Sequence, residues 1–109
     1  PASPCLSSRL APGVEATPER VARVEEAENL IRDLGYPDCR VRVHAGELAR
    51  IELPEGSLDE FFREGHAVET RRRLNGLGFR FVTIDLGGLN SGGMNELVPL
   101  EIRARFRQI

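Results

Sequence analysis

Lysine is missing from this sequence of 109 residues, because all 15 of its basic side chains are arginine. Schiff-base lysine chemistry and a Walker-type phosphate lysine are therefore excluded within this chain. No apolar run approaches the roughly 18–20 residues that a membrane helix needs. No charged-then-apolar leader of the signal-peptide type opens the sequence. We therefore expect a cytoplasmic protein with no membrane partner.

Cysteine is also scarce, with Cys5 near the start and Cys39 in the middle of the chain. One pair cannot form the disulfide framework of a small secreted protein, and no Cys-x-x-Cys spacing suggests zinc. His44 and His66 do not form a metal cluster with these cysteines by spacing. We expect two free thiols in a reducing compartment, and no metal site.

The remaining composition is that of an ordinary globular protein, with 40% hydrophobic and 29% charged residues. This length suits one compact domain. The formal net charge of −2 argues against a nucleic-acid partner, although it leaves room for a local basic patch. The only methionine is Met94, so we expect a processed product, a cloned fragment or the ordered part of a longer protein.

The apolar pattern predicts a first helix that Thr17 caps, that Pro18 opens and that Gly35 ends. Its apolar side chains recur at helical spacing, at Val21, Val24, Ala27, Ile31 and Leu34. Period-two alternation then predicts strands over residues 40–44 and 48–53, paired as an antiparallel hairpin.

Two further helices and a strand are predicted after the hairpin. Ser57 and Glu60 match a capping box that opens a short helix, and a second helix covers residues 64–75 with Val68 and Leu74 facing inward. Residues 79–86 have the mixed apolar pattern of a central strand. The order α-β-β-α-β predicts an α+β fold, a small and mainly antiparallel sheet with helices packed on one face.

Three segments are expected. Residues 1–16 form a flexible leading segment that contains Cys5, residues 17–97 form the α+β domain, and residues 98–109 form a tail without assigned structure.

The first candidate site is the polar face of the predicted hairpin. Arg40, Arg42 and His44 emerge on the same side of a strand, about 6–7 Å apart along it. Arg50 and Glu52 of the next strand share that side. Guanidinium groups bind phosphate or carboxylate with two hydrogen bonds, so this face fits an anion. The alternative is a solvated sheet face that nearby acidic side chains balance.

The second candidate is Cys5, followed by Ser8 and Arg9. A cysteine in a mobile segment near an arginine can be accessible and have its thiolate favoured. The alternative is an unreactive thiol in a tail.

The remaining motifs have plainer interpretations. Residues 71–73 are three arginines with acidic neighbours, which favours a solvated helix face over a nucleic-acid contact. His66 is interpreted as a residue that serves packing or solvation, and Cys39 as a small semi-buried residue. Residues 91–96, Ser-Gly-Gly-Met-Asn-Glu, are similar to the Ser-Gly-Gly-x-Asp-Ser loop of ATP pyrophosphatases. Asparagine replaces the acid there, so we interpret them as a tail loop.

Several of these motifs together resemble a known family. They are Pro-Cys-Leu-Ser-Ser-Arg at residues 4–9, Thr-Pro-Glu at 17–19, Arg-Val-Arg-Val-His at 40–44, Leu-Ala-Arg-Ile-Glu at 48–52 and the segments at 77–86 and 91–96. Their order and spacing are similar to the region that follows the ATP-binding domain in ATP-dependent sacrificial sulfur transferases, the LarE family of PP-loop ATP pyrophosphatases. The resemblance covers residues 4–97.

The resemblance implies a sulfur-donating and oligomer-forming C-terminal domain. Its partners would be its own N-terminal ATP-binding domain, a pyridinium mononucleotide substrate and further copies of itself as a homo-oligomer. ATP and magnesium would act in the longer protein, and none would bind to this fragment, which alone should not turn over substrate. The product would enter assembly of the nickel-pincer cofactor of lactate racemase.

The resemblance also implies roles for five residues. Cys5 would attack the activated carboxylate and leave its sulfur on the product, becoming dehydroalanine. Ser8, Arg9, Arg40 and Arg42 would hold the phosphate of the mononucleotide. The rival interpretations are a non-catalytic anion- or nucleotide-binding module, in which Cys5 plays no part, and an oligomerisation module.

Overall fold

Residues 6–89 are the part of the chain that the computed structural model describes. Helices and strands follow one another in the predicted order, which confirms the α+β class. The elements are η1 (Leu6–Arg9), α1 (Pro18–Asp33), β1 (Arg40–His44), β2 (Leu48–Glu52), η2 (Glu55–Ser57), α2 (Leu58–Arg63), α3 (His66–Leu77) and β3 (Phe81–Ile84), where η1 and η2 are short 3-10 helices. No helix within this part is both long and apolar enough to cross a membrane.

Helix α1 begins as its sequence predicts. Thr17 has extended backbone angles, and its Oγ1 accepts a hydrogen bond from the backbone N–H of Arg20 at 3.1 Å. This bond satisfies one of the amides that a helix start leaves unpaired, and Pro18 occupies the first turn. Val24, Ala27 and Ile31 are fully buried on one side of the helix, so α1 anchors the core.

The start of α2 differs from the capping box that the sequence suggests. Ser57 precedes the helix but makes no side-chain cap hydrogen bond. The 3-10 helix η2 leads directly into α2, and the backbone N–H of Leu58 donates to the carbonyl of Glu55. A backbone hydrogen bond therefore satisfies an amide at the start of α2, in place of the predicted bond to the serine hydroxyl.

The three described strands form a mixed sheet in the order β1-β2-β3. β1 and β2 are antiparallel, as predicted, with Arg42 opposite Arg50. β3 runs parallel to β2, and it lies at the edge of this three-stranded sheet, so the prediction of a central strand was wrong. A parallel neighbour requires a crossover connection, which α2 and α3 supply.

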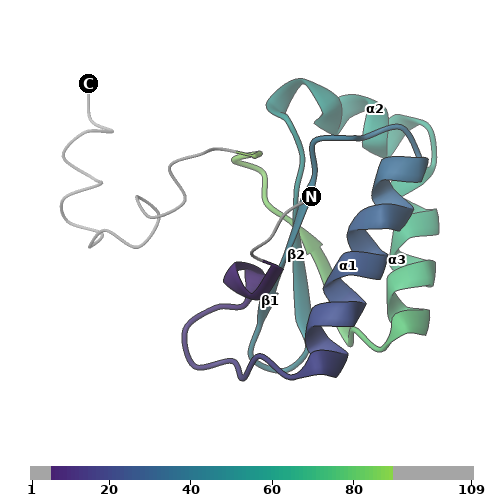
Figure 1. The fold of residues 1–109 in the computed structure, drawn as a ribbon. Coiled ribbons are helices and arrows are strands. Elements are labelled where there is room, and N and C mark those ends of the chain that lie inside the picture. The colour runs from purple at the N-terminus through teal and green to yellow at the C-terminus, as the bar shows by residue number, and fades with distance from the viewer. Residues whose placement is uncertain (1–5, 90–109) are drawn as a thin grey trace, which may run out of the picture.

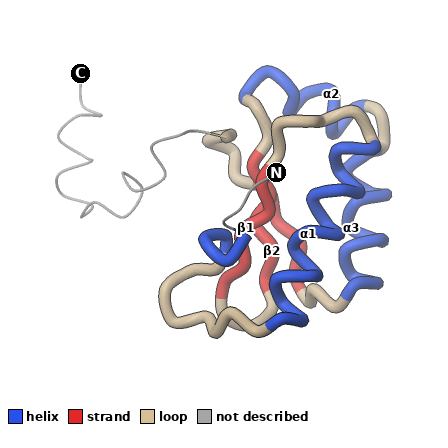
Figure 2. The backbone as a smooth tube through the Cα atoms, viewed as in Figure 1, coloured by secondary structure: helices blue, strands red, loops and turns tan. Residues whose placement is uncertain are grey.

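Both long helices lie on one side of the sheet, and α1 and α3 run next to each other there (Figures 1 and 2). The sheet contributes Val41, Val43, Ala49 and Ile51 to the core between the layers, and Leu74 of α3 is fully buried with them. Val68 is 74% exposed, so its predicted inward position was wrong. The opposite face of the sheet carries the polar side chains of the hairpin.

Candidate functional site

Two arginine side chains of β1 project from the face of the sheet opposite the helices. Burial alternates along this strand, with Val41 and Val43 in the core, so Arg40 and Arg42 share the outward face as the sequence predicts. Arg50 lies directly opposite Arg42 and brings a third guanidinium to the same face. We call this surface the arginine face; it consists of Arg40, Arg42, His44, Arg50 and Glu52.

Carboxylates neutralise only part of the charge on the arginine face. Nε of Arg42 donates to Oε1 of Glu52 at 3.2 Å. Arg50 lies 3.5 Å from the same carboxylate and 3.5 Å from Oδ2 of Asp85. Arg40 is exposed, and within residues 6–89 no ion pair or side-chain hydrogen bond engages it. Three guanidinium groups thus face two carboxylates, which leaves a positive surface suited to an anion.

His44 lies at the end of β1, where its side chain is partly buried. Burial lowers the pKa of its imidazole below its ordinary value of 6.5, and the charges of Arg50 and Arg42 lower it further, while Glu52 opposes them. An anion that approaches the arginine face would favour the protonated imidazole. A protonated His44 can therefore add an imidazolium donor to the guanidinium groups when an anion binds.

The 3-10 helix η1 lies beside the outer edge of β1. Leu10 forms a parallel bridge with Val43, and the backbone N–H of Ala11 donates to the carbonyl of Val43 at 2.8 Å. Nη1 of Arg42 lies 3.5 Å from the carbonyl oxygen of Ser8, at the long limit of a hydrogen bond. Ser8 itself is exposed. Cys5, which directly precedes η1 in the sequence, lies outside the described residues.

Arg9, the last residue of η1, is buried rather than presented to solvent. Only 5% of it is exposed, and its Nε and Nη2 donate to the carboxylate of Glu28 at 2.7 and 3.3 Å. Glu28 is not among the residues that the sequence predicts for the site, although its position carries a signal. Glu28 lies four residues after Val24 and three before Ile31, within the apolar stripe of α1, where a carboxylate needs a buried partner.

Cys39 is a buried packing residue, as its sequence context indicates. Its side chain is 4% exposed, and its Sγ donates to the backbone carbonyl of Glu28 at 3.6 Å. Burial raises the pKa of the thiol to about 12, and the charge of Glu28 adds to the effect. Because the thiolate is the nucleophilic form of cysteine, this residue is inert at neutral pH.

The other motifs also have structural explanations. Arg71, Arg72 and Arg73 are exposed on α3, and the latter two pair with Glu69, which fits the solvated face that their context indicates. His66 packs against aromatic rings, and its Nδ1 lies 2.6 Å from the hydroxyl of Tyr36. The loop at residues 91–96 lies outside the described residues. Among residues 6–89 no three side chains form a metal-binding group.

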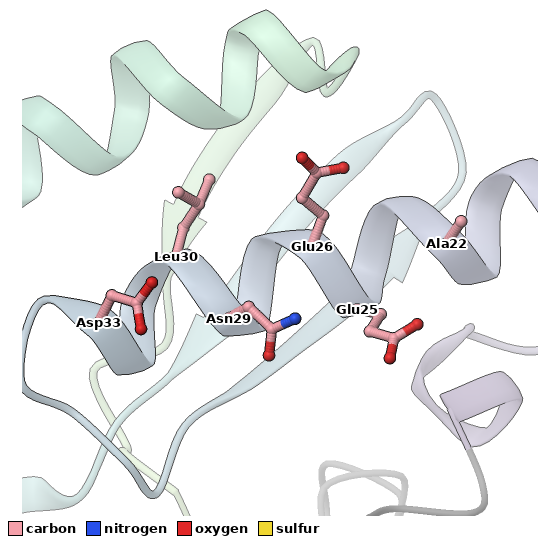
Figure 3. A pocket seen from close by; sticks show the side chains of 6 residues that line it. All are labelled: Ala22, Glu25, Glu26, Asn29, Leu30 and Asp33. Atoms are coloured by element: carbon pink, nitrogen blue, oxygen red, sulfur yellow. The ribbon is translucent and has the colours of Figure 1, made fainter.

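A shallow pocket on the surface of α1 has the opposite electrostatic character to the arginine face (Figure 3). One helix supplies its whole lining: Ala22, Glu25, Glu26, Asn29, Leu30 and Asp33. Its three carboxylates would repel a phosphate. The arginine face is therefore the better candidate for an anion site in the described part of the chain.

The fold and this face define a small α+β domain with a basic surface suited to an anion, and comparison with known proteins makes the assignment specific. The chain is 46% identical over 105 residues, 96% of its length, to pyridinium-3,5-bisthiocarboxylic acid mononucleotide synthase from Lactiplantibacillus plantarum. It is 43% identical over 98 residues, 90% of its length, to an uncharacterized protein from Synechocystis sp.. No protein-family model matches the chain.

The chain spans 37% and 36% of the lengths of these two relatives. The match extends over nearly all of this sequence but only about a third of each relative, as expected for one domain of a larger protein. The resemblance to the LarE family of sulfur transferases is thus confirmed.

Proposed function

We propose that this chain is the sulfur-donating domain of an ATP-dependent sulfur transferase that thiolates an adenylated pyridinium mononucleotide carboxylate. One observation supports the proposal most strongly. The segment that directly follows Cys5 lies beside the edge strand whose outward side chains include Arg40 and Arg42. The element that directly follows Cys5 in the sequence is therefore a neighbour of the strand that carries the arginine face, which supports the proposal.

In the proposed reaction, the substrate carboxylate first attacks the α-phosphorus of ATP, which forms an acyl adenylate and releases pyrophosphate. The thiolate of Cys5 then attacks the acyl carbon, so that a carbon–sulfur bond forms and AMP leaves. Removal of the Cα proton of Cys5 and cleavage of its Cβ–S bond complete the transfer. The product is a thiocarboxylate, and the cysteine becomes dehydroalanine, so each chain acts once.

The arginine face would hold the substrate by its phosphate during this transfer. Arg40 is exposed and Arg42 is half-buried beside it, so both can present N–H groups to phosphate oxygens. Ser8 lies at the same edge of the sheet and would add a hydroxyl donor. Arg9 belongs to the same proposed set, and its tie to Glu28 has a further consequence that is developed below.

Adenylation would take place on a separate ATP-binding domain of the same protein, with ATP and magnesium as its co-reactants. The proposed product would feed assembly of a nickel-pincer cofactor. We also propose that the protein works as a homo-oligomer. Light scattering of the whole protein would report its assembly state directly.

The matched variants Cys5→Ala and Cys39→Ala test the proposal in the protein that carries this domain together with its ATP-binding domain. Cys5→Ala should still release pyrophosphate from ATP but form no thiolated product. Cys39→Ala should still form it, because the buried thiol takes no part. Full product formation by Cys5→Ala would instead favour a non-catalytic anion-binding module, the alternative that the arginine face alone would support.

A further inference from the structure

The carboxylate of Glu28 lies at a junction of three elements. Its residue is 0% exposed, although it belongs to the middle of a helix that faces water on its other side. Oε2 accepts hydrogen bonds from Nε of Arg9 at 2.7 Å and from the backbone N–H of Val41 at 2.9 Å. Oε1 accepts from Nη2 of Arg9 at 3.3 Å and from Nη2 of Arg32 at 3.2 Å. One side chain of α1 thus binds both η1 and β1.

A contribution to stability explains this arrangement poorly. Removing two charges from water is costly, and well-packed apolar residues often stabilise a fold as well as a buried ion pair does. The pair of Arg9 and Glu28 instead fixes how η1 is placed relative to α1. The guanidinium of Arg9 is planar and its two donors meet two carboxylate oxygens, so the position and the orientation of η1 relative to α1 are both constrained.

Glu28 binds Arg9 and the backbone of Val41, and each lies close in sequence to one part of the proposed site, the thiol of Cys5 or the arginines of β1. Arg9 lies four residues after Cys5, at the end of the short helix that the cysteine precedes. Val41 lies between Arg40 and Arg42, and the bond to its backbone N–H fixes the strand at that point. A single carboxylate therefore ties η1, the element that directly follows Cys5 in the sequence, to β1, the strand that carries Arg40 and Arg42.

We propose that Glu28 is a positioning residue that holds η1, the element that directly follows Cys5 in the sequence, in place beside β1, with Arg9 as the link. This inference rests on the proposed function. Glu28 is buried and touches neither substrate nor the reacting atoms, so it acts only through its partners. Misplacing a nucleophile by about 1 Å can slow a reaction about 100-fold while the substrate still binds. Loss of Glu28 should therefore slow sulfur transfer much more than it weakens substrate binding.

The test uses the protein with its ATP-binding domain and two readouts: the affinity for the pyridinium mononucleotide, and the single-turnover rate of sulfur loss from Cys5 at saturating substrate. Glu28→Gln should lower the rate by about 100-fold and change the affinity less than about threefold. Arg32→Ala is the matched control. It removes one partner of Glu28 but leaves the bonds to Arg9 and Val41, so its rate should stay near that of the wild type.

A double variant keeps the test decisive if Glu28→Gln does not fold. Glu28→Leu with Arg9→Met removes both buried charges together, which proteins often tolerate. We expect this variant to fold, which thermal unfolding would show, and to transfer sulfur slowly at saturating substrate, because the side-chain link between α1 and η1 is lost. A folded double variant with the wild-type rate would overturn the inference.

The wild-type protein separates failure of this inference from failure of the proposed function. If the wild type loses no sulfur from Cys5 with ATP and substrate present, the proposed function fails. If the wild type transfers sulfur and a folded Glu28→Gln protein does so equally fast, the function stands and the positioning role is refuted.

Discussion

Arg42 and Arg50 lie directly opposite each other across the β-hairpin, so two guanidinium groups share one face of the sheet. Like charges in this arrangement normally destabilise a sheet. Here Glu52 contacts both groups, and Asp85 contacts Arg50 from the end of β3. The compensation leaves Arg40 unpaired within the described residues, and this imbalance makes the face a candidate for an anion.

Arg40→Ala tests whether the excess positive charge on the arginine face binds an anion. Because the side chain is exposed and makes no ion pair within residues 6–89, its loss should leave the free energy of unfolding within about 0.5 kcal/mol of the wild type. It should weaken binding of the pyridinium mononucleotide by about tenfold, because a charge-assisted contact to phosphate is lost. Arg71→Ala, on the exposed face of α3, is the control and should change neither quantity. Unaltered affinity in Arg40→Ala would show that the arginine face is only solvated.

Arg42→Ala should differ from Arg40→Ala in its effect on stability. Glu52 is 5% exposed, and it loses its hydrogen bond from Nε of Arg42 in this variant. A buried carboxylate that loses a partner costs about 1–3 kcal/mol. Urea denaturation should therefore show a lower free energy of unfolding for Arg42→Ala than for Arg40→Ala. Equal stabilities would mean that the pair with Glu52 contributes nothing.

His44 should make stability depend on pH just below neutrality. Its pKa in the folded protein lies below the ordinary value of 6.5, mainly because of burial and then because of Arg50 and Arg42. The unfolded chain therefore binds more protons in this range, so stability should be lost as pH falls below about 6.5 and regained as it rises. His44→Gln should flatten this part of the curve. Thermal unfolding between pH 5.5 and 7.5 measures it, and identical slopes for the two proteins would contradict the prediction.

Glu47 should contribute stability with the pH dependence of a paired carboxylate. Its oxygens accept hydrogen bonds from Arg20 and Arg23 at 2.9 and 2.6 Å. The bond from Arg20 is the main reason that its pKa lies below the ordinary value of 4.5. This contribution is present above pH 4.5 and is lost as pH falls through the folded-state pKa. Glu47→Gln should thus lower the unfolding midpoint at neutral pH, and the difference should shrink in acid. A difference independent of pH would refute the charge-based explanation.

Features that depend on neighbouring residues could be predicted from the sequence, whereas the pairing of distant strands could not. Thr17 and Pro18 define the start of α1 because capping depends on a few neighbouring residues. The alternation over residues 40–44 predicted which side chains share a face, because that follows from strand geometry alone. The parallel pairing of β3 with β2 depends on how α2 and α3 cross the sheet, which no local pattern specifies.

The sequence predicts the charged surface of the candidate site but not the buried ion pair of Arg9 and Glu28. Arg40 and Arg42 could be assigned to one face from their spacing. The burial of Arg9 could not, because it results from Glu28, 19 residues away in the sequence. Val68 shows the converse error, since an apolar residue was assigned to the core although α3 buries Thr70 and Leu74 on another side.

The most direct test of the whole account is the intact mass of the protein that carries this domain and its ATP-binding domain, measured after one turnover with ATP and the pyridinium mononucleotide. Conversion of Cys5 to dehydroalanine removes the elements of hydrogen sulfide, so the mass should fall by about 34 Da, and peptide mapping should locate the loss at Cys5. An unchanged mass while thiolated product accumulates would contradict the account, because the sulfur would then come from elsewhere.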